Sequence, residues 1–331
     1  MLKQISRKVG DLLGIYQLKW NKRPNGIYCF NYHRIGDKSK TSFDPNVFSC
    51  DSSLFEEHIK FFKYYFVILD TEQLIELIDS GKPIDDKYAV ITFDDGYIDN
   101  YTLAYPILKK LSCPAIMYIA TDFISQQILP WWDEVAWLVK NNDPKDFIGL
   151  PWGLPKNMER LKLDKQIQLI LRAIKDNKNT QINEKLQILR SKANKNIASE
   201  LGHEKLFMDW DMIKEMSRNV VDIGSQTCSH RILSHLTNNE QEHEIIHSKA
   251  LLEEKTNEKV ISLAYPVGGH EAYNETTIGI TKSSGYKFAF TFIADINKSI
   301  DHNNRFTMSR FSIDNQCSIN EIKQRICKYI E

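Results

Sequence analysis

The stretch ITFDDGY (91–97) carries the strongest structural and chemical signal in the chain. An apolar run ends in two adjacent carboxylates, Asp94 and Asp95, and Gly96 then lets the backbone turn sharply. At the frayed end of a strand both carboxylates can converge on the carboxyl edge of a parallel sheet. Adjacent acids repel each other, so one is best neutralised by a metal or another cation while the other acts as a base. A solvated Asp-Asp-Gly turn is the alternative interpretation.

On both sides of this segment, short apolar runs alternate with helical stretches, which predicts an α/β domain with parallel strands. A barrel and an open doubly wound sheet both fit this alternation. The expected strands span 26–33, 66–70, 88–95, 115–120, 220–224, 260–266, 287–292 and 305–313. The expected helices span 52–65 (with Ser52 as the cap), 71–80, 105–111, 240–255, 276–284 and 319–330.

Composition narrows the class of protein. The 331 residues allow about two domains or one domain with insertions. Lys and Arg balance Asp and Glu at 43 each, so the electrostatic footprint of a nucleic-acid binder is missing and we expect no nucleic-acid partner. Residues 140–205 are rich in Lys, Asn, Gln and Leu and predict a helical insertion. The six scattered cysteines, without a CxxC pair, indicate reduced and partly buried thiols.

Residues 1–25 form a separate basic and amphipathic segment. Apolar residues recur there at helical spacing, with Lys and Arg between them. Such a helix either packs on the domain or lies on an anionic membrane surface. The segment has no apolar core of the kind a secretory signal needs, so we expect a cytoplasmic protein with peripheral contact at the inner membrane face. No apolar run approaches the roughly 20 residues needed to span a bilayer.

Two further strand ends carry polar or turn residues. In IGSQTCSHRILSHL (223–236), Gln226 and His230 are four residues apart, so one helical turn would place them on the same face. His230 is a candidate metal ligand together with an aspartate from another strand end, whereas His235 fits a packing or rim position. In LAYPVGG (263–269), free backbone N–H groups at a tight turn could hold a developing oxyanion, although such a segment is often only a turn.

Taken together and in this order, the segments resemble the NodB-like polysaccharide deacetylases (carbohydrate esterase family four). TFDDG matches the first motif of that family, which implies Asp94 as the catalytic base and Asp95 as a metal ligand. QTCSH falls on the second motif, with His230 in its second metal-histidine position, and AYPVG falls on the third. NYHRI and PWWDE (130–134) are similar to a bacterial surface-polysaccharide branch of the family.

The resemblance covers roughly 26–135 and 205–315 and implies a distorted, incomplete (β/α) barrel with its site at the carboxyl ends of the strands. It makes 26–331 a single deacetylase-like catalytic domain. The implied activity is divalent-metal-dependent removal of N-acetyl groups from amino sugars, with zinc, cobalt or nickel as the metal. The implied partner is an N-acetylated glycan of a surface polysaccharide or its lipid-linked precursor.

Several residues depart from the family pattern. Gln226 stands where the family has its first metal histidine, and an amide oxygen is the weaker zinc ligand, so we expect weak metal binding. The third motif commonly carries an arginine that orients the catalytic aspartate; that position is Ala264, and Arg310 is our candidate replacement. The closing segment RFTMSRFSID lacks the usual acid histidine, so His33 is either the general acid or a structural histidine.

The leading hypothesis is therefore amide hydrolysis. Asp94 acts as base, Asp95 and His230 hold the metal with Gln226 or water, and the Val267 N–H stabilises the oxyanion. Trp131, Trp132 and Tyr265 either stack on sugar rings or belong to the core. The alternatives are a degenerate deacetylase that binds glycan without chemistry and a hydrolase of another amide or ester.

Overall fold

The structure, a computed structural model, describes residues 15–155, 157–176, 182–195 and 205–330. Eight parallel strands form one curled sheet in the order β10-β1-β5-β6-β7-β8-β9, with β4 paired beside β5. Within the described residues no ladder joins β9 to β10, so the barrel stays incomplete. The strands are β1 (Gly26–Tyr32), β4 (Val67–Ile68), β5 (Lys87–Phe93), β6 (Ala115–Ile119), β7 (Val221–Ser225), β8 (Ser262–Ala264), β9 (Phe288–Phe290) and β10 (Phe311–Ser312), and a separate pair is β2 (Arg34–Ile35) with β3 (Phe48–Cys50).

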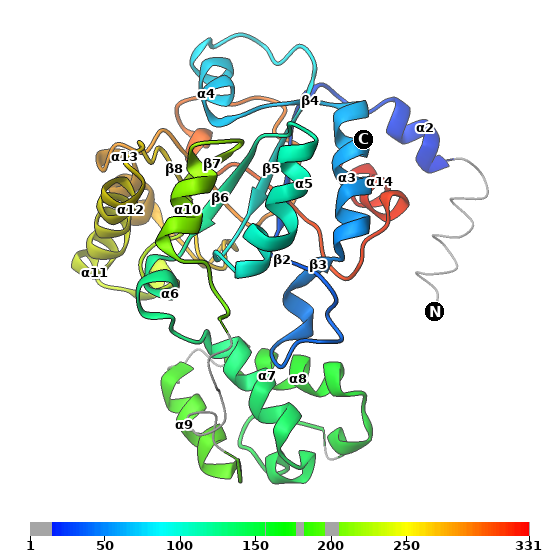
Figure 1. Ribbon diagram of the computed structural model, residues 1–331, viewed down its shortest axis with the longest axis vertical. Coiled ribbons are helices and arrows are strands. Elements are labelled where there is room, and N and C mark those ends of the chain that lie inside the picture. The colour runs from blue at the N-terminus through cyan, green and yellow to red at the C-terminus, as the bar shows by residue number, and fades with distance from the viewer. Residues whose placement is uncertain (1–14, 156, 177–181, 196–204, 331) are drawn as a thin grey trace.

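Helices pack around the outside of this curled sheet (Figure 1), which is the incomplete (β/α) barrel that the resemblance implied. The helices that follow the strands are α3 (Ser52–Tyr65), α4 (Thr71–Asp79), α5 (Tyr105–Lys110), α6 (Thr121–Gln126), α10 (Trp210–Ser217), α11 (Asn238–Glu242), α12 (Ser248–Thr256), α13 (Glu275–Ser283) and α14 (Ile319–Cys327). The predicted alternation of strands and helices is thus confirmed, with shorter strands than expected.

Side chains alternate between two buried faces along each strand. Tyr28 and Phe30 on β1 face the large core beneath the helices, whereas Ile27 and Cys29 belong to a second cluster within the curl of the sheet. On β5 this inner row runs from the apolar Val90 to the polar Thr92 and then to Asp94. The inner face therefore changes from apolar to polar toward the carboxyl edge of the sheet, where the site lies.

Local details differ from the sequence prediction at two ends. The cap of α3 is Asp51, whose carboxylate accepts the Leu54 N–H at 2.9 Å, and not Ser52, which is the first helical residue. The segment 305–313 contributes only the short strand β10, because a 3₁₀ turn occupies Asn304–Phe306 before it. Both differences arise from side-chain and backbone hydrogen bonds that the apolar pattern does not encode.

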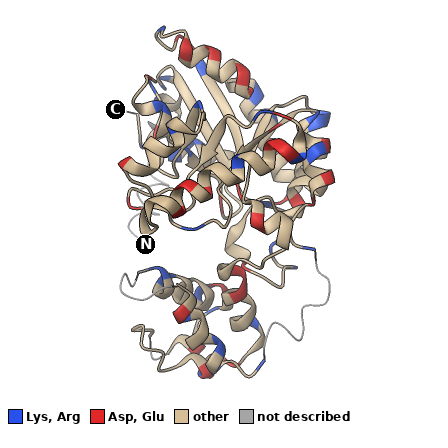
Figure 2. Cartoon of the chain, turned by 90° about the vertical axis from the view of Figure 1, so that its left-hand side faces the viewer, with Lys and Arg blue, Asp and Glu red and all other residues tan. Residues whose placement is uncertain are grey.

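Three helices, α7 (Trp131–Asn141), α8 (Leu163–Asp176) and α9 (Ile182–Lys192), build a helical lobe beside the barrel. The lobe begins at Trp131, earlier than the 140–205 insertion expected from composition. Arg190 of α9 binds Glu134 of α7 through two hydrogen bonds of 2.5 and 2.7 Å. Figures 1 and 2 show the lobe on the side of the barrel where α6 follows β6, which is the carboxyl end of the strands.

The N-terminal helix predicted over 1–25 is seen only in part, because residues 1–14 lie outside the described residues. Helix α2 (Ile15–Asn21) packs against α14, and Lys19 Nζ donates to the carbonyl of Ile330, just after the end of α14, at 2.7 Å. Trp20 is fully buried, and the Arg23 guanidinium lies 4.1 Å from the centre of its ring. Among the described helices, none has the length and apolar character to cross a membrane.

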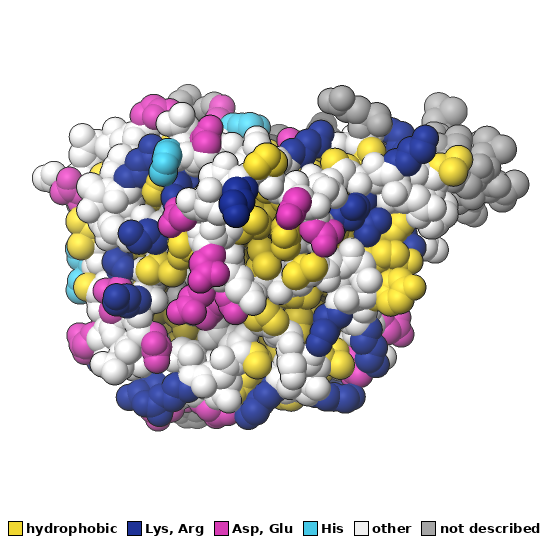
Figure 3. Space-filling view, turned by 90° about the horizontal axis from the view of Figure 1, so that it is seen from above, with side chains coloured by type: hydrophobic (Ala, Val, Ile, Leu, Met, Phe, Trp, Pro, Cys, Tyr) yellow, Lys and Arg dark blue, Asp and Glu magenta, His cyan; other side chains and the backbone are white. Residues whose placement is uncertain are grey.

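The surface charges and the cysteines are arranged as the composition predicted. On the face opposite the lobe, Lys and Arg side chains are interspersed with Asp and Glu (Figure 3). All six cysteines are buried and unpaired, as the sequence predicted. Their burial raises the pKa of each thiol above its usual value, which keeps these side chains unreactive.

Candidate active site

Asp94 lies just after β5 and is held by Arg310. The guanidinium donates from Nη1 to Oδ1 at 2.8 Å and from Nη2 to Oδ2 at 3.0 Å, a two-point contact that fixes the plane of the carboxylate. Both side chains are almost fully buried. The structure thus brings Arg310, from the segment leading into β10, to the carboxylate that the sequence singled out as a base.

A polar network continues behind this pair. Asn31 on β1 donates to Asp94 Oδ2 at 3.1 Å and accepts from Arg310 at 2.8 Å and from the Thr92 hydroxyl at 2.7 Å. His33 Nε2 lies 4.0 Å from Asp94 Oδ2. Sequence reasoning missed Asn31, although a polar residue inside an apolar buried strand is itself a signal of a buried network.

Asp95 sits in a strained turn beside this network. Its φ of 77° is in the left-handed region that non-glycine residues rarely adopt. A Cβ at the next residue, Gly96, would lie 3.1 Å from the Ile119 side chain, so the turn has little room for a larger residue. The Asp95 N–H donates to Gln226 Oε1 at 2.7 Å, which holds the turn in place.

Asp95 faces His230 across a short gap. His230 Nε2 lies 3.4 Å from Asp95 Oδ1, and this buried oxygen has no hydrogen-bond partner among the described residues. Burial and the neighbouring Asp94 raise the pKa of Asp95 well above its usual range. Burial lowers the pKa of His230 to about 4. In the absence of a cation the pair therefore favours a protonated carboxyl beside a neutral imidazole.

The lobe and α6 hold His230 in place. Its ring packs against Trp132 at 5.1 Å and Phe123 at 6.0 Å between centroids. The Trp132 indole donates to Tyr97 Oη at 2.8 Å, and the Tyr97 hydroxyl donates to Asp133 Oδ2 at 2.9 Å. Burial raises the pKa of Asp133 to about 7. Tyr97 and Asp133 were missed in the sequence because their partners come from distant segments.

Gln226 and His230 do not share a helical face, contrary to the sequence expectation. They lie in an irregular loop after β7, in which Thr227 and His230 have φ values of 69° and 57°. This conformation, and not a helical turn, carries both side chains to Asp95. The Gln226 amide oxygen accepts a hydrogen bond from the Asp95 N–H. Gln226 therefore contacts the backbone of Asp95, the residue predicted to bind a metal through its side chain. His235 ends the 3₁₀ turn Leu233–His235, two residues before the α11 cap Thr237, and its side chain is exposed.

The third turn, after β8, is also strained. Val267 has a φ of 63°, and its N–H has no acceptor among the hydrogen bonds of the described residues. A Cβ on Gly268 would lie 2.5 Å from the Phe292 nitrogen, so glycine is required there, whereas Gly269 faces open space. Tyr265 is buried and stacks on Tyr273 at 4.7 Å, so it belongs to the core and does not contact solvent.

The residues at this edge fit a cation in part. The unpartnered Asp95 Oδ1 and the neutral His230 nitrogen are both suitable donors for a divalent metal. No cluster of three or more His, Cys, Asp or Glu side chains suited to a metal occurs in the described part of the chain. A third donor would therefore have to be Gln226, water or substrate.

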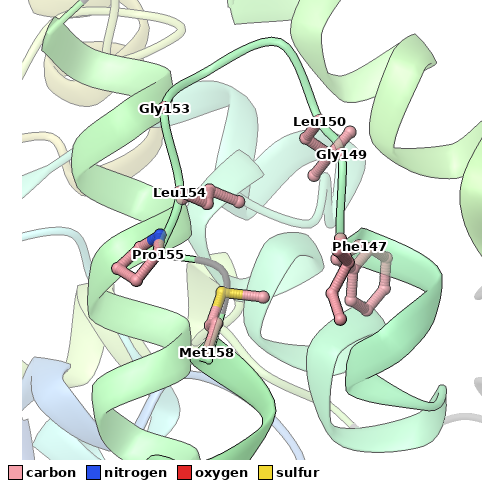
Figure 4. Close-up of a pocket in the computed structure, with 8 residues that line it drawn as sticks. Phe147, Gly149, Leu150, Gly153, Leu154, Pro155 and Met158 are labelled. Carbon is pink, nitrogen blue, oxygen red and sulfur yellow. The ribbon is translucent and has the colours of Figure 1, made fainter.

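A separate hollow of about 460 Å³ lies in the lobe (Figure 4). Its lining is Phe147, Ile148, Gly149, Leu150, Gly153, Leu154, Pro155 and Met158. None of these side chains can donate or accept a proton or bind a metal strongly, so the hollow is not the reaction centre.

Comparison with known proteins agrees with this geometry. The polysaccharide deacetylase family model matches residues 81–289. YxkH of Bacillus subtilis, named for the same family, is 24% identical over 272 residues, which cover 82% of this chain and 66% of YxkH. The poly-beta-1,6-N-acetyl-D-glucosamine N-deacetylase of Escherichia coli K12 is 30% identical over 93 residues, covering 28% of this chain and 13% of that protein.

Among solved structures, the Streptococcus pyogenes deacetylase PplD covers 93% of this chain and is itself covered completely, with a TM-score of 0.59 and 18% identity. That likeness concerns the fold. The curled parallel sheet, the two carboxylates at its edge and the match of the family model over most of the barrel lead to one assignment: the chain belongs to the polysaccharide deacetylase family.

Proposed function

We propose that the protein is a metal-dependent hydrolase that removes N-acetyl groups from amino sugars of a surface polysaccharide or its lipid-linked precursor. The observation that carries the proposal is the contrast between two adjacent carboxylates. Asp94 is fixed by Arg310, whereas Asp95 presents an unpartnered oxygen to His230. Separate environments for neighbouring acids allow separate roles. The similarity to a poly-N-acetylglucosamine deacetylase supports the choice of substrate class.

In this proposal Asp94 takes a proton from the attacking water. Arg310 and Asn31 hold the carboxylate in position through their hydrogen bonds. As water adds to the acetamide carbon, negative charge develops on the carbonyl oxygen. The Val267 N–H is the proposed donor to this oxygen, because it has no acceptor within the described protein.

Asp95 and His230 would hold the metal, with Gln226 or water completing the shell. A bound divalent metal polarises the carbonyl and lowers the pKa of a water molecule. The Gln226 amide keeps Asp95 in its left-handed turn, whether or not it also contributes a ligand. Zinc, cobalt and nickel all bind well to an imidazole and a carboxylate, so the proposal names a divalent metal of this group.

His33 is the proposed proton donor to the leaving amine. Burial is the main cause of the lowered pKa of His33, so the imidazole is neutral in the resting protein. Its proton would come from Asp94, 4.0 Å away, after that carboxylate has accepted one from water. The carbon–nitrogen bond then breaks, and the amine leaves with the proton while acetate remains.

Acetate release tests the activity. We expect release from short N-acetylglucosamine oligomers when zinc, cobalt or nickel is added, and none from Asp94→Asn. No release by the wild-type protein with any divalent metal, polymer or lipid-linked amino sugar would contradict the proposal.

A glycan-binding protein without chemistry is the second candidate. It is favoured by the absence, among the described residues, of a group of three strong metal ligands. Metal content and chelation separate the two functions. A protein that purifies without metal and binds glycan equally well in the presence of a chelator supports the binding function.

We also propose peripheral contact with the cytoplasmic membrane face through the N-terminal segment. The supporting features are the basic, apolar pattern of residues 1–25 and the exposed Leu18 of α2. Sedimentation with anionic vesicles is the test. We expect binding that weakens with salt and with Leu18→Ser, and periplasmic fractionation of the untagged protein would contradict the location.

A further inference from the structure

The loop that carries His230 is held by one buried carboxylate, that of Glu244. Its Oε2 accepts the N–H groups of Cys228 and Ser229, each at 2.9 Å, and its Oε1 accepts the Ser229 hydroxyl. Only 4% of the Glu244 surface is exposed. Three donors from two adjacent loop residues therefore converge on one side chain that is almost completely buried.

The residues that Glu244 holds lie between the two left-handed positions of the loop. Thr227 and His230 have φ values of 69° and 57°, and Cys228 and Ser229 are the two residues between them. Such conformations at non-glycine residues persist only where the surrounding structure over-determines them. Glu244 supplies a constraint of this kind at the step directly before His230.

Other parts of the fold pair with the beginning of the loop. The Gln226 N–H donates to the last carbonyl of β6 at 2.9 Å, and the first N–H of α6 donates to the Thr227 carbonyl at 3.2 Å. A backbone N–H that is removed from water needs an acceptor. For the N–H groups of Cys228 and Ser229, that acceptor is Glu244.

A wide helical turn carries Glu244. The residues His243–His247 form a π-helical turn, η7, between α11 and α12, and such a turn inserts an extra residue into a helix. Cys228 Sγ donates to the Glu244 carbonyl at 3.6 Å, so the loop contacts the backbone of the turn as well as its side chain. The hydroxyls of Ser248, directly after the turn, and Ser225 of β7 are hydrogen-bonded at 2.7 Å. The turn is therefore joined both to the loop and to the strand before it.

We propose that Glu244 is a positioning residue for the site, which fixes the loop conformation in which His230 reaches Asp95 and thereby sets the affinity for a metal. The inference rests on the proposed metal-dependent function. Glu244 acts through the N–H groups of Cys228 and Ser229, so it needs no contact with metal or substrate. Its role depends on the reach of two acceptor atoms and not on its charge.

Three substitutions at position 244 separate reach from charge. Glu244→Gln keeps the length and an oxygen that can accept both N–H groups, and its NH₂ can donate to the Ser229 hydroxyl. Glu244→Asp keeps the charge but is one methylene shorter, and Glu244→Ala removes the acceptor. Gln241→Ala is the matched control, because Gln241 is buried in the preceding turn and its hydrogen bonds go to the Leu236 carbonyl and the Thr277 hydroxyl.

Zinc titration measures the effect on the site. We expect Glu244→Ala to weaken zinc binding by about 10- to 100-fold, as the loss of a partner behind a metal ligand commonly does. Glu244→Asp should weaken it nearly as much, whereas Glu244→Gln and Gln241→Ala should change it by less than about threefold. Wild-type affinity in Glu244→Ala would overturn the proposal. A loss from Glu244→Gln as large as that from Glu244→Ala would also overturn it, because charge would then be the cause.

A measurement on the metal-free protein separates the positioning role from the proposed function. The His230 ring lies 5.1 Å from the Trp132 ring, so displacement of the imidazole changes the NMR chemical shift of the Trp132 indole N–H. Trp132→Phe identifies this signal among those of the six tryptophans. We expect the signal to move in Glu244→Ala and Glu244→Asp and to stay in place in Glu244→Gln and Gln241→Ala. An unmoved signal in Glu244→Ala overturns the positioning role.

The two measurements fail separately. Absence of zinc binding by the wild-type protein would contradict the metal-dependent function and leave the indole signal to decide the role of Glu244. If Glu244→Ala does not fold, Glu244→Asp gives the deciding comparison, and an unmoved indole signal in that variant overturns the role.

Discussion

At the residue scale, Asp94 and Asp95 are chain neighbours with opposite surroundings. Asp94 receives hydrogen bonds from Arg310 and Asn31, whereas Asp95 keeps one buried oxygen without a partner in the described residues. The difference arises because strand geometry directs Asp94 to the inner face and the left-handed turn redirects Asp95 toward His230. A pair of acids can thus divide base and metal-binding work without leaving adjacent positions.

Removal of the Arg310 guanidinium tests this division. Because Arg310→Met leaves Asp94 buried and unpaired, we expect it to lower the free energy of unfolding by about 3–5 kcal/mol. The double variant Asp94→Asn with Arg310→Met should recover part of that loss, since the uncompensated charge is gone. Urea unfolding measures both. The control is Arg231→Met, which breaks the exposed pair with Glu240 and should change stability by less than about 1 kcal/mol. Equal losses of stability from Arg310→Met and Arg231→Met would show that the contact between Arg310 and Asp94 does not stabilise the fold.

Gln226→His tests the second departure from the family pattern. An imidazole is a stronger ligand than an amide oxygen, so we expect zinc affinity to rise by about tenfold or more. The same change removes the acceptor of the Asp95 N–H, so we expect the metal-free protein to lose about 1–3 kcal/mol of stability. Zinc titration and urea unfolding measure the two effects separately. Unchanged zinc affinity would mean that Gln226 only positions Asp95.

At the element scale, helix α3 begins with a different cap from the one predicted by the sequence. Asp51 accepts the Leu54 N–H, whereas Ser52 is the first residue of the helix. We expect Asp51→Ala to lower the free energy of unfolding by about 1 kcal/mol, the usual worth of an N-cap. Ser52→Ala is the matched control and should change stability by no more than about 0.5 kcal/mol. A larger loss of stability from Ser52→Ala than from Asp51→Ala would show that Ser52, and not Asp51, caps the helix.

In helix α7, the buried carboxyl of Asp133 makes the stability of the protein depend on pH. Burial raises the pKa of this carboxyl to about 7, whereas in the unfolded chain it titrates near about 3.9. Between these values the folded state holds the extra proton, so the contribution of Asp133 to stability falls as pH rises. Asp133→Asn stays neutral and removes this decline.

We therefore expect the stability of Asp133→Asn relative to the wild type to increase between about pH 4.5 and about pH 7.5. Thermal unfolding at the two pH values measures the change. Asp164→Asn, at an exposed position on α8, is the control and should show no such trend. A flat difference for Asp133→Asn would show that the carboxyl is not protonated in the folded protein.

At the scale of the whole molecule, the proposed metal binding can be tested through its effect on stability. Zinc that binds only the folded protein should stabilise it by about 2.7 kcal/mol at a concentration of about 100 times Kd. The increase in Tm should disappear in His230→Ala, because His230 lies beside Asp95, and persist in His235→Ala, because the His235 side chain is exposed. Retention of the full increase in His230→Ala would move the metal to another place on the protein.

The amino-acid sequence by itself determined the order of strands and helices and the position of the chemistry. Short apolar runs predicted the strands, and ITFDDGY predicted two acids at a strand end, where the carboxyl edge of a parallel sheet offers polar side chains a place. The resemblance to deacetylases followed from the order of three such ends. These signals depend only on residues close together in the chain, so they can be recognised without the tertiary structure.

Only the tertiary structure decided which distant residues meet. Arg310 reaches Asp94 across 216 residues of sequence, and Gln226 reaches the Asp95 N–H across 131. Tyr97 of the barrel donates to Asp133 of the lobe, a contact that no spacing in the chain predicts. The turns at Asp95, His230 and Val267 are left-handed against their intrinsic preference. Such backbone conformations and long-range contacts are stabilised by the packed whole, and the sequence pattern of any one segment does not contain them.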